Sequence, residues 1–485
     1  STASHNTAIG YLALCSNTTG ENNTAVGLNV MLSNTTGCYN HALGRNTLMD
    51  NTTGCYSTAI GQQALQNSSA TGDTGNTAVG ALALYENTSA TNNTAVGRLA
   101  LSCNTTAAGN VAVGSLAGQA ITTGHSQTAL GFCALMTATT GEGNTALGNG
   151  ALKLTTTPND NTAVGRRALC NNTTGANNVS VGAYSLCCNT TGTVNTAVGM
   201  GALNFNTTGG SNTAVGQGAL YANTTASDNV AVGREAMYTN TTGTENTAVG
   251  HDALYSNTTE NSNSAFGFQA LRANTNDANT GIGYRALCSN TSGCLNTALG
   301  TSAGRDITTG DNNLTLGYFA GRSSSPSGAI TTGNNNVVLG DDNISNLFCA
   351  DTSISSSDLR DKTDIEDFTH GLDFVTKLNP KTYRWDKRSW YTTNDDQSIL
   401  DVTPDGSKKR NKKHIGFLAQ DVLALEKEIG FANDRDDMLV VNQTEDETRY
   451  GLKYERLVPV LVNAIKELSE ENKDLKSRIE ALESN

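Results

Sequence analysis

The stretch N-T-A-V-G-M-G-A-L-N-F-N-T-T-G-G-S, from Asn195 to Ser211, is one unit of a repeat that fills most of this chain. The next unit begins at Asn212, and most units are 17 residues long. The first glycine of the unit recurs at positions 10, 27, 44, 61, 80, 97, 114, 131, 148, 165, 182, 199, 216, 233, 250, 267, 283, 300, 317 and 340. Self-similarity at a fixed period of this kind is typical of stacked coils.

Each column of the repeat has a physical meaning. The residue before the glycine is Val, Ile, Leu or Phe in every unit, as at Val198, and Ala usually precedes it, as at Ala197. We expect this pair to supply the side chains that a narrow coil buries, because alternate strand residues face inward. The glycine is expected where the backbone turns sharply or packs closely. The Asn four residues before it, as at Asn195, predicts a ladder of side-chain amides.

A unit of 17 residues has room for two short strands and two turns. We therefore predict a mainly β fold in which each repeat is one coil of a parallel β-roll or β-helix, with coils about 4.8 Å apart. About two residues of Leu or Val size per coil give one roll a thin core, so three associated chains would bury more apolar area. A monomeric solenoid is the alternative. The predicted shaft spans residues 1–345.

Composition sets limits on partners and cofactors. The formal net charge of −13 argues against nucleic acid as a partner, since that binding needs clustered Lys and Arg. The basic run 408–413 is predicted to be a solvated loop. No apolar stretch is long enough to insert into a membrane. The eleven cysteines include no C-x-x-C pair, so we expect no metal and no cofactor, and we expect assembly in the cytosol with reduced thiols.

Two cysteine pairs repeat at the coil spacing. Cys38 and Cys55 occupy one column of successive units, as do Cys170 and Cys187. Stacked Cα atoms would lie within disulfide range, although small buried thiols are favoured. The sequence leaves their oxidation state open.

The pattern N-T-A-V-G-x-x-A-L, which covers residues 5–340, resembles the repeat of trimeric autotransporter adhesin heads and of many phage fibre shafts. That resemblance implies a left-handed β-roll associated in threes.

Charge density rises abruptly near residue 350, where the repeat ends and ordinary α+β sequence begins. We expect a helix turn at 371–375, a strand at 379–385 and a strand leading into a helix at 414–422. A Ser-rich junction, 346–357, precedes Asp358, Arg360 and Lys362. Serine is a poor nucleophile until a base removes its proton, and Lys362 can act only if burial or a nearby cation lowers its pKa. Taken alone, the motif also fits a loop that opens a helix with Ser357 as its N-cap.

Two motifs together resemble the intramolecular chaperone family of self-cleaving serine peptidases, found at the C-termini of phage endosialidases, tail fibres and neck appendages. The pattern Ser-Asp-x-Arg-x-Lys is met by Ser357, Asp358, Arg360 and Lys362, and His-x-Gly-Phe-x-Ala-Gln by His414, Gly416, Phe417, Ala419 and Gln420. The resemblance covers 350–485 and departs from the family at Asp361, where an aliphatic residue is usual and an acidic one is expected to slow cleavage.

The family resemblance implies a single-turnover Ser-Lys endopeptidase that acts on its own chain and on no external substrate. It assigns catalysis to Ser357, Lys362 and His414, and support to Asp358, Arg360 and Gln420. The family's scissile bond is Ser357–Asp358. However, the Ser357 hydroxyl closes a four-membered ring if it attacks the carbonyl of its own residue. It closes a five-membered ring if it attacks the carbonyl of Ser356. A second chain or a water molecule would resolve this, and the sequence leaves the side of the cut open.

The last residues, 457–485, predict a coiled-coil helix behind the peptidase domain, 358–456. Its apolar seam follows alternating steps of three and four residues through Val458, Leu461, Ile465, Leu468, Asn472, Leu475, Ile479 and Leu482. β-branched residues at one seam position and Leu at the other favour two strands, whereas the shaft and the family favour three.

These features predict a viral fibre, a phage tail fibre assembled in the host cytoplasm. Its tail would set the register of a homotrimer and then release itself at Ser357. Its partners would be its own copies and a host cell-surface receptor, with a glycan as one candidate class. The alternative is a bacterial trimeric surface adhesin with a self-cleaving tail, for which we expect membrane-anchoring strands in place of a heptad helix.

Overall fold

The computed structural model describes residues 2–344, 362–391, 402–444 and 448–484. It divides into two compact units, Ser1–Thr297 and Ala298–Asn485. In the described residues, no helix is long and apolar enough to cross a membrane.

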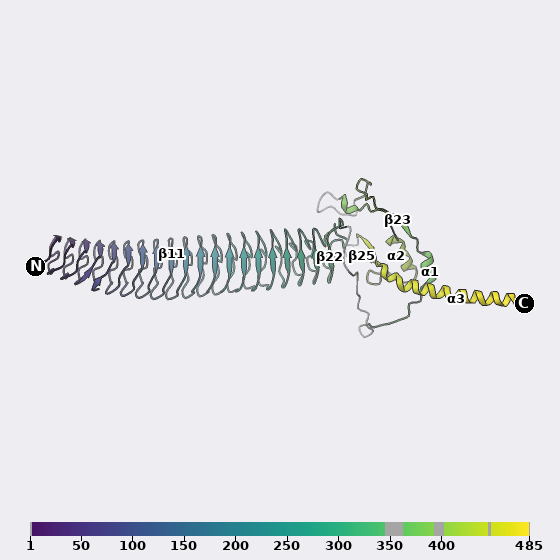
Figure 1. Ribbon diagram of the computed structural model, residues 1–485, viewed down its shortest axis with the longest axis horizontal. Helices are drawn as coiled ribbons and strands as arrows, with labels where there is room; N and C mark the ends of the chain where they lie inside the picture. The colour runs from purple at the N-terminus through teal and green to yellow at the C-terminus, as the bar shows by residue number, and fades with distance from the viewer. Residues whose placement is uncertain (1, 345–361, 392–401, 445–447, 485) are drawn as a thin grey trace. The chain divides into compact units, whose positions relative to one another are not determined.

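The first unit is a parallel β-solenoid, as predicted, in which one short strand per repeat stacks on the next in chain order (Figure 1). Its main strands are β1 (Thr7–Ile9), β2 (Thr24–Val26), β3 (His41–Leu43), β5 (Thr58–Ile60), β7 (Thr77–Val79), β8 (Thr94–Val96), β9 (Val111–Val113), β10 (Thr128–Leu130), β11 (Thr145–Leu147), β12 (Thr162–Val164), β13 (Val179–Val181), β14 (Thr196–Val198), β15 (Thr213–Val215), β16 (Val230–Val232), β17 (Thr247–Val249), β18 (Ser264–Phe266) and β19 (Thr280–Ile282). A side pair, β4 (Gly54–Cys55) and β6 (Gly72–Asp73), is also parallel.

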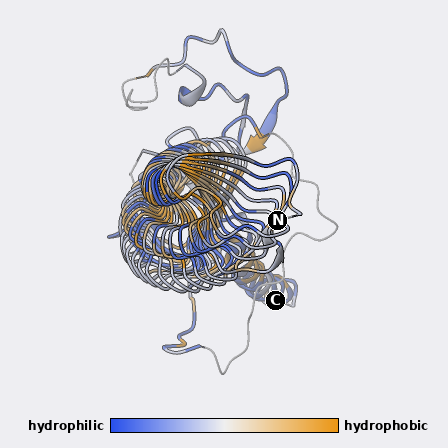
Figure 2. Ribbon diagram, turned by 90° about the vertical axis from the view of Figure 1, so that its left-hand side faces the viewer, coloured by the Kyte–Doolittle hydropathy of each residue, from blue (hydrophilic) through white to orange (hydrophobic). Residues whose placement is uncertain are grey.

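Strand pairing sets like residues against like residues. Between β14 and β15, Ala197 pairs with Ala214 and Val198 with Val215, and the same register holds in the neighbouring pairs. Each column of the repeat therefore becomes a row of similar side chains along the unit. The overlaid coils in Figure 2 show apolar residues gathered in such bands.

The expectation for the large strand residue is wrong. Ala197, Ala202 and Leu203 are completely buried, whereas Val198, directly before the glycine, is 36% exposed. Many other members of its column are exposed, among them Leu43, Ile60, Leu130, Leu147, Phe266 and Ile282, and the rest are half-buried. The interior is filled by alanines together with the larger Leu203, and alternation along the strand turns Val198 outward because Ala197 faces inward.

The predicted asparagine ladder is present and is accompanied by a second one. Asn195 accepts a hydrogen bond from the backbone N–H of Asn212 through its Oδ1 at 3.0 Å. The Asn of each N-T-T triplet forms the second ladder, as where Asn206 Nδ2 donates to Asn189 Oδ1 at 2.8 Å. These amides are fully buried. They satisfy one another and the turn carbonyls, which is how a buried polar group avoids its desolvation cost.

The recurring glycine is required for two reasons, its backbone conformation and its close contact with the next coil. Gly199 has φ +135°, a conformation that L side chains rarely adopt. A Cβ there would also lie 2.4 Å from the carbonyl oxygen of Gly216 in the next coil. Gly210, in the turn, has no such φ, and the nearest atom to its Cβ would be 3.1 Å away.

Gly199→Ala is therefore expected to destabilise the solenoid by at least 2–3 kcal/mol, roughly the cost of strained backbone alone. Gly210→Ala is the matched control and should change stability by less than about 1 kcal/mol. Thermal unfolding followed by circular dichroism compares the two. Equal midpoints for the two variants would show that the close approach of successive coils is not a constraint.

The second unit begins with the same strand pattern and then changes to α+β structure. Its strands and helices are β20 (Thr297–Leu299, at the boundary), β21 (Leu314–Leu316), β22 (Val337–Leu339), α1 (Leu372–Lys377), β23 (Lys381–Tyr383), η2 (Arg388–Trp390), β24 (His414–Gly416), α2 (Ala419–Glu428), β25 (Val441–Gln443), β26 (Tyr450–Leu452), η4 (Tyr454–Arg456) and α3 (Leu457–Glu483). The predicted helix turn, strand, strand-to-helix segment and terminal helix all occur. β23 pairs with β24 and β25 with β26, both antiparallel.

Candidate functional site

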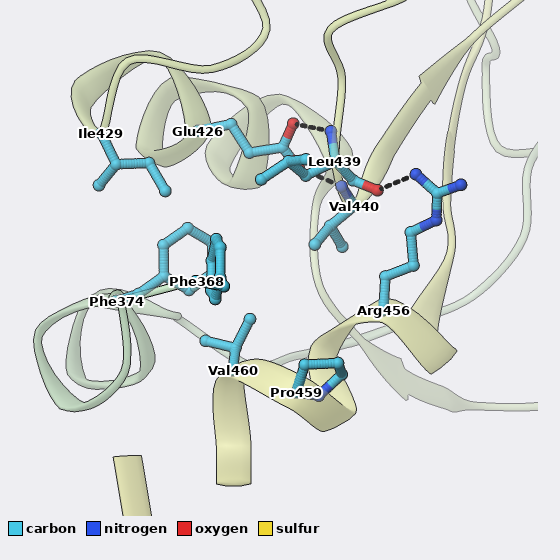
Figure 3. A pocket seen from close by; sticks show the side chains of 9 residues that line it. All are labelled: Phe368, Phe374, Glu426, Ile429, Leu439, Val440, Arg456, Pro459 and Val460. Carbon is cyan, nitrogen blue, oxygen red and sulfur yellow. Dashed lines mark hydrogen bonds between the residues drawn. The ribbon is translucent and has the colours of Figure 1, made fainter. Parts of the chain in front are cut away.

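A small apolar core holds the α+β part together. It is formed where α1, α2, β25 and the start of α3 meet, by Phe374, Val422, Val440, Val441, Leu457 and Val460. A cavity of about 270 Å³ opens beside it, lined by Phe368, Phe374, Glu426, Ile429, Leu439, Val440, Arg456, Pro459 and Val460 (Figure 3). The core fixes the position of α2, and with it the segment that carries the second motif.

A buried carboxylate organises this core. Glu426 is completely buried and accepts backbone N–H bonds from Leu439 at 3.0 Å and Val440 at 2.6 Å (Figure 3), and from Val441 at 2.8 Å. The three donors are the two residues before β25 and its first residue, Val441, so the start of this strand depends on one side chain of α2. The sequence analysis missed Glu426. The available signal was its spacing of one helical turn from the apolar Val422, which places it on the buried face of α2.

Glu426→Gln is expected to destabilise this unit by about 1–3 kcal/mol, because an amide offers one acceptor atom to three buried donors. Glu428→Gln is the matched control on the same helix. Glu428 bonds Lys377 at 2.8 Å on the exposed surface, so its loss should cost less than about 1 kcal/mol. The chain's two tryptophans, Trp385 and Trp390, lie in this unit, so urea unfolding followed by tryptophan fluorescence reports on it. A control variant as unstable as Glu426→Gln would contradict the assigned role.

The second motif lies on β24 and the start of α2. His414 pairs with Tyr383 across the β23–β24 ladder, and its half-buried ring stacks on that of Tyr383 with centroids 5.7 Å apart. The ring of Trp385 approaches His414 edge-on at 6.3 Å. Gln420 is the second residue of α2 and is exposed. The aromatic neighbours hold the imidazole in place, and its edge remains partly open.

The glycine and phenylalanine of the same motif have a packing role. A Cβ on Gly416 would lie 2.4 Å from the hydroxyl oxygen of Tyr454. That hydroxyl accepts the backbone N–H of Phe417 at 3.1 Å, and the two rings stack at 6.1 Å. Only glycine leaves room for Tyr454 at this position, so the motif ties β24 to the segment before α3.

The first motif is only partly described. Ser357, Asp358, Arg360 and Asp361 lie outside the described residues, and Lys362, the first described residue after the junction, is exposed. The structure therefore brings His414 and Gln420 onto adjacent elements, and it does not show how Lys362 and Ser357 meet.

A buried carboxylate holds the residues that precede the junction. Asp342, just after β22, is 3% exposed, and its carboxylate pairs with Arg449 at 2.6 Å and Lys387 at 3.3 Å. The Ser389 hydroxyl donates to the same group. Within the second unit, the chain that leads to the junction is thus anchored by residues at the start of η2 and by the residue directly before β26.

The basic run 408–413 is exposed for most of its length, as predicted, yet two of its side chains are held by aromatic rings. The ammonium of Lys408 lies 5.2 Å from the ring centroid of Tyr391, and the guanidinium of Arg410 lies 4.8 Å from that of Trp390. Such cation–π contacts give the run a packing role in addition to its solvation.

Aromatic residues in successive coils of the first unit stack on one another. The rings of Tyr221, Tyr238 and Tyr255 stack at 4.9 and 5.4 Å with interplanar angles of 1° and 4°. The columns were not predicted, and they stabilise neighbouring coils.

Comparison with known proteins finds one family match, at this end of the chain. Residues 357–431 match a peptidase family model described as "Chaperone of endosialidase". The match begins at Ser357 and contains all six predicted site residues. No curated protein and no solved structure matches the chain. A β-solenoid followed by such a segment fits a tail fibre that carries its own chaperone domain, and the family implies self-cleaving chaperone activity.

Proposed function

We propose that this chain is a phage tail fibre protein that assembles as a homotrimer in the host cytoplasm and then cuts its own backbone at Ser357. The observation that carries the proposal is the family match, which starts at Ser357 directly behind a repetitive parallel shaft. In the virion, the shaft would attach to a host cell-surface receptor, for which a glycan is one candidate class.

Register is the physical problem that the tail would solve. Like residues pair with like residues in every coil, so a slip of one repeat preserves almost every contact. Parallel pairing over long stretches also forms slowly, because distant contacts must close first. A tail of unique sequence that associates first would bring equivalent repeats of the three chains into register. The coils of the shaft could then fold one after another from that end.

Two exposed apolar surfaces support association of identical chains. On the shaft, the column that contains Leu130 and Leu147 is about 40% exposed at each of these residues and recurs once per coil. On α3, the predicted seam is exposed in a single chain, with Ile465 at 67% and Leu468 at 48%. A partner that covers this column must present apolar residues at the same spacing, one per coil. A second copy of the same chain does so. Burying about 40 Å² per coil would contribute roughly 1 kcal/mol per coil.

The chemistry follows from that association. The Ser357 hydroxyl would attack the adjoining carbonyl, with Lys362 taking its proton and His414 supporting the site. The C–N bond of that carbonyl would break as its nitrogen takes up the proton, and water would then hydrolyse the resulting ester. Lys362 is exposed in the single chain, so we expect the approach of a second chain to enclose it beside Ser357, where it can act as a base. Each chain cleaves one peptide bond of its own, so the reaction is single-turnover. Release of the tail then leaves the shaft kinetically trapped.

The shaft interface is tested by the double variant Leu130→Asp with Leu147→Asp. It places carboxylates of all three chains in the apolar contact at two successive coils, and unpaired buried charge is strongly unfavourable. We expect the melting temperature of the assembly to fall by at least about 5 °C. Thr140→Asp with Thr157→Asp is the control, since both threonines are exposed in the turn column of neighbouring coils.

Light scattering gives the mass of each assembly alongside the melting curve. Equal melting temperatures for the two double variants would remove the strand column from the interface. A wild-type mass of one chain would refute the trimer itself.

A further inference from the structure

We propose that Cys38 and Cys55 form an oxidation site, in which a small disulfide such as oxidised glutathione converts the two thiols into an intrachain disulfide. The bond would join two neighbouring coils of the shaft. The inference is independent of cleavage and of trimer formation, because both cysteines belong to one chain and lie far from Ser357 in the sequence.

The two sulfurs already face each other. Cys38 Sγ and Cys55 Sγ lie 2.8 Å apart, and the backbone N–H of Cys38 donates to Cys55 Sγ at 3.0 Å. The backbone N–H of Tyr56 donates to the Cys38 carbonyl at 3.1 Å, so the two coils are in register here. Strands in register lie about 4.8 Å apart, inside the Cα separation that a disulfide needs.

A second cysteine pair provides the comparison within the same chain. Cys170 and Cys187 are also separated by 17 residues, and their coils are also in register, since Asn171 N–H donates to the Cys187 carbonyl at 3.1 Å. No sulfur–sulfur hydrogen bond joins these two cysteines, both of which the structure describes. Spacing alone therefore does not produce the contact at Cys38 and Cys55.

The reaction balances with the named oxidant. One cysteine thiolate attacks a glutathione sulfur, a protein–glutathione disulfide forms and one glutathione thiolate leaves. The second cysteine thiolate then attacks the protein sulfur of that disulfide and releases the other glutathione. The cysteines lose two electrons, the glutathione gains them, and the two thiol protons end on the two released glutathione molecules.

The local environment predicts a slow reaction at neutral pH. Burial and the hydrogen bond with Cys55 raise the pKa of Cys38 to about 11. Because the thiolate is the attacking species, its fraction should rise about tenfold for each pH unit below that pKa. The bond should thus form faster at pH 9 than at pH 7. Once formed, it closes a loop of one coil and fixes the register of the two coils covalently.

The test uses the folded full chain, incubated with oxidised glutathione at pH 9, alkylated and mapped by mass spectrometry. We expect a Cys38–Cys55 linked peptide, about 2 Da lighter than the two reduced peptides together, while Cys170 and Cys187 are recovered alkylated. Cys55→Ser should stop at a glutathione adduct on Cys38. The oxidised wild type should melt at a higher temperature than the reduced protein, and oxidation should not raise the melting temperature of Cys55→Ser.

Three outcomes would overturn the proposal. The first is recovery of Cys38 and Cys55 as thiols or as separate glutathione adducts in the folded chain. The second is linkage of Cys170 to Cys187 with the same yield. The third is an equal yield of the Cys38–Cys55 peptide from chain denatured in urea, which would show that the coil geometry does not direct the reaction. Ser357→Ala should behave as wild type here, so failed oxidation and failed cleavage are distinguishable.

Discussion

Ser357→Ala is expected to leave every chain at its full 485 residues, whereas the wild type separates into pieces of about 357 and about 128 residues. Alanine has no hydroxyl, so no nucleophile remains at the junction even if the tail associates correctly. The matched control is Ser356→Ala, which removes a neighbouring hydroxyl of the same junction and should still be cut. Denaturing electrophoresis with intact mass measurement resolves the three proteins.

The fragment masses also settle which side of the serine is cut. A larger piece that ends at Ser357 indicates the family's bond, and one that ends at Ser356 indicates attack on the preceding carbonyl. Persistent cleavage of Ser357→Ala at the same bond would falsify the assignment of the nucleophile. If Ser356→Ala and Ser357→Ala lose cleavage equally, cleavage depends on the conformation of the junction and not on the Ser357 hydroxyl specifically.

Ile465→Asp is expected to reduce the cleaved fraction at least about tenfold, which corresponds to about 1.4 kcal/mol in the association that precedes cleavage. The residue is 67% exposed on the seam of α3, and in a trimer it would set three carboxylates against one another in an apolar layer. Ser477→Asp introduces the same side chain off the seam of the same helix and should be processed like wild type.

Sedimentation of both α3 variants alongside electrophoresis separates assembly from chemistry. The account predicts that Ile465→Asp loses trimer and cleavage together. A monomeric Ile465→Asp chain that is still fully cut would show that association does not activate the site. Loss of both properties in Ser477→Asp as well would mean that added charge, and not the seam, is responsible.

Most features of the shaft could be predicted from the repeat. The coil length, the parallel stacking, the glycine at the close approach and the asparagine ladder were all predicted from columns of the sequence. The inward residue was predicted wrongly, because a strand of period two can turn either Ala197 or Val198 inward. Hydrophobicity favours the valine, but Ala197 faces the interior that Leu203 of the same coil fills, and alternation then turns Val198 outward. Which strand residue shares the interior with the leucine depends on the tertiary fold, and no single column of the repeat reveals it.

The tail was less predictable at the level of contacts. Local pattern located α1, β24, α2 and the long α3, whose residues follow helical or strand spacing. Glu426 accepts three backbone N–H groups at the start of β25, and these donors lie thirteen to fifteen residues further along the chain. The role of Gly416 likewise depends on Tyr454, in a separate element. Such contacts form only in the tertiary fold. A local motif can therefore identify the residues but not the partners that they contact.

The most direct test follows refolding of the wild-type chain at several concentrations, with sedimentation and denaturing mass spectrometry on the same samples. The account predicts that trimer appears first, that cleavage follows it, and that both accelerate with chain concentration. Cleavage at a concentration-independent rate in monomeric chains, or trimers that stay at full length throughout, would contradict it.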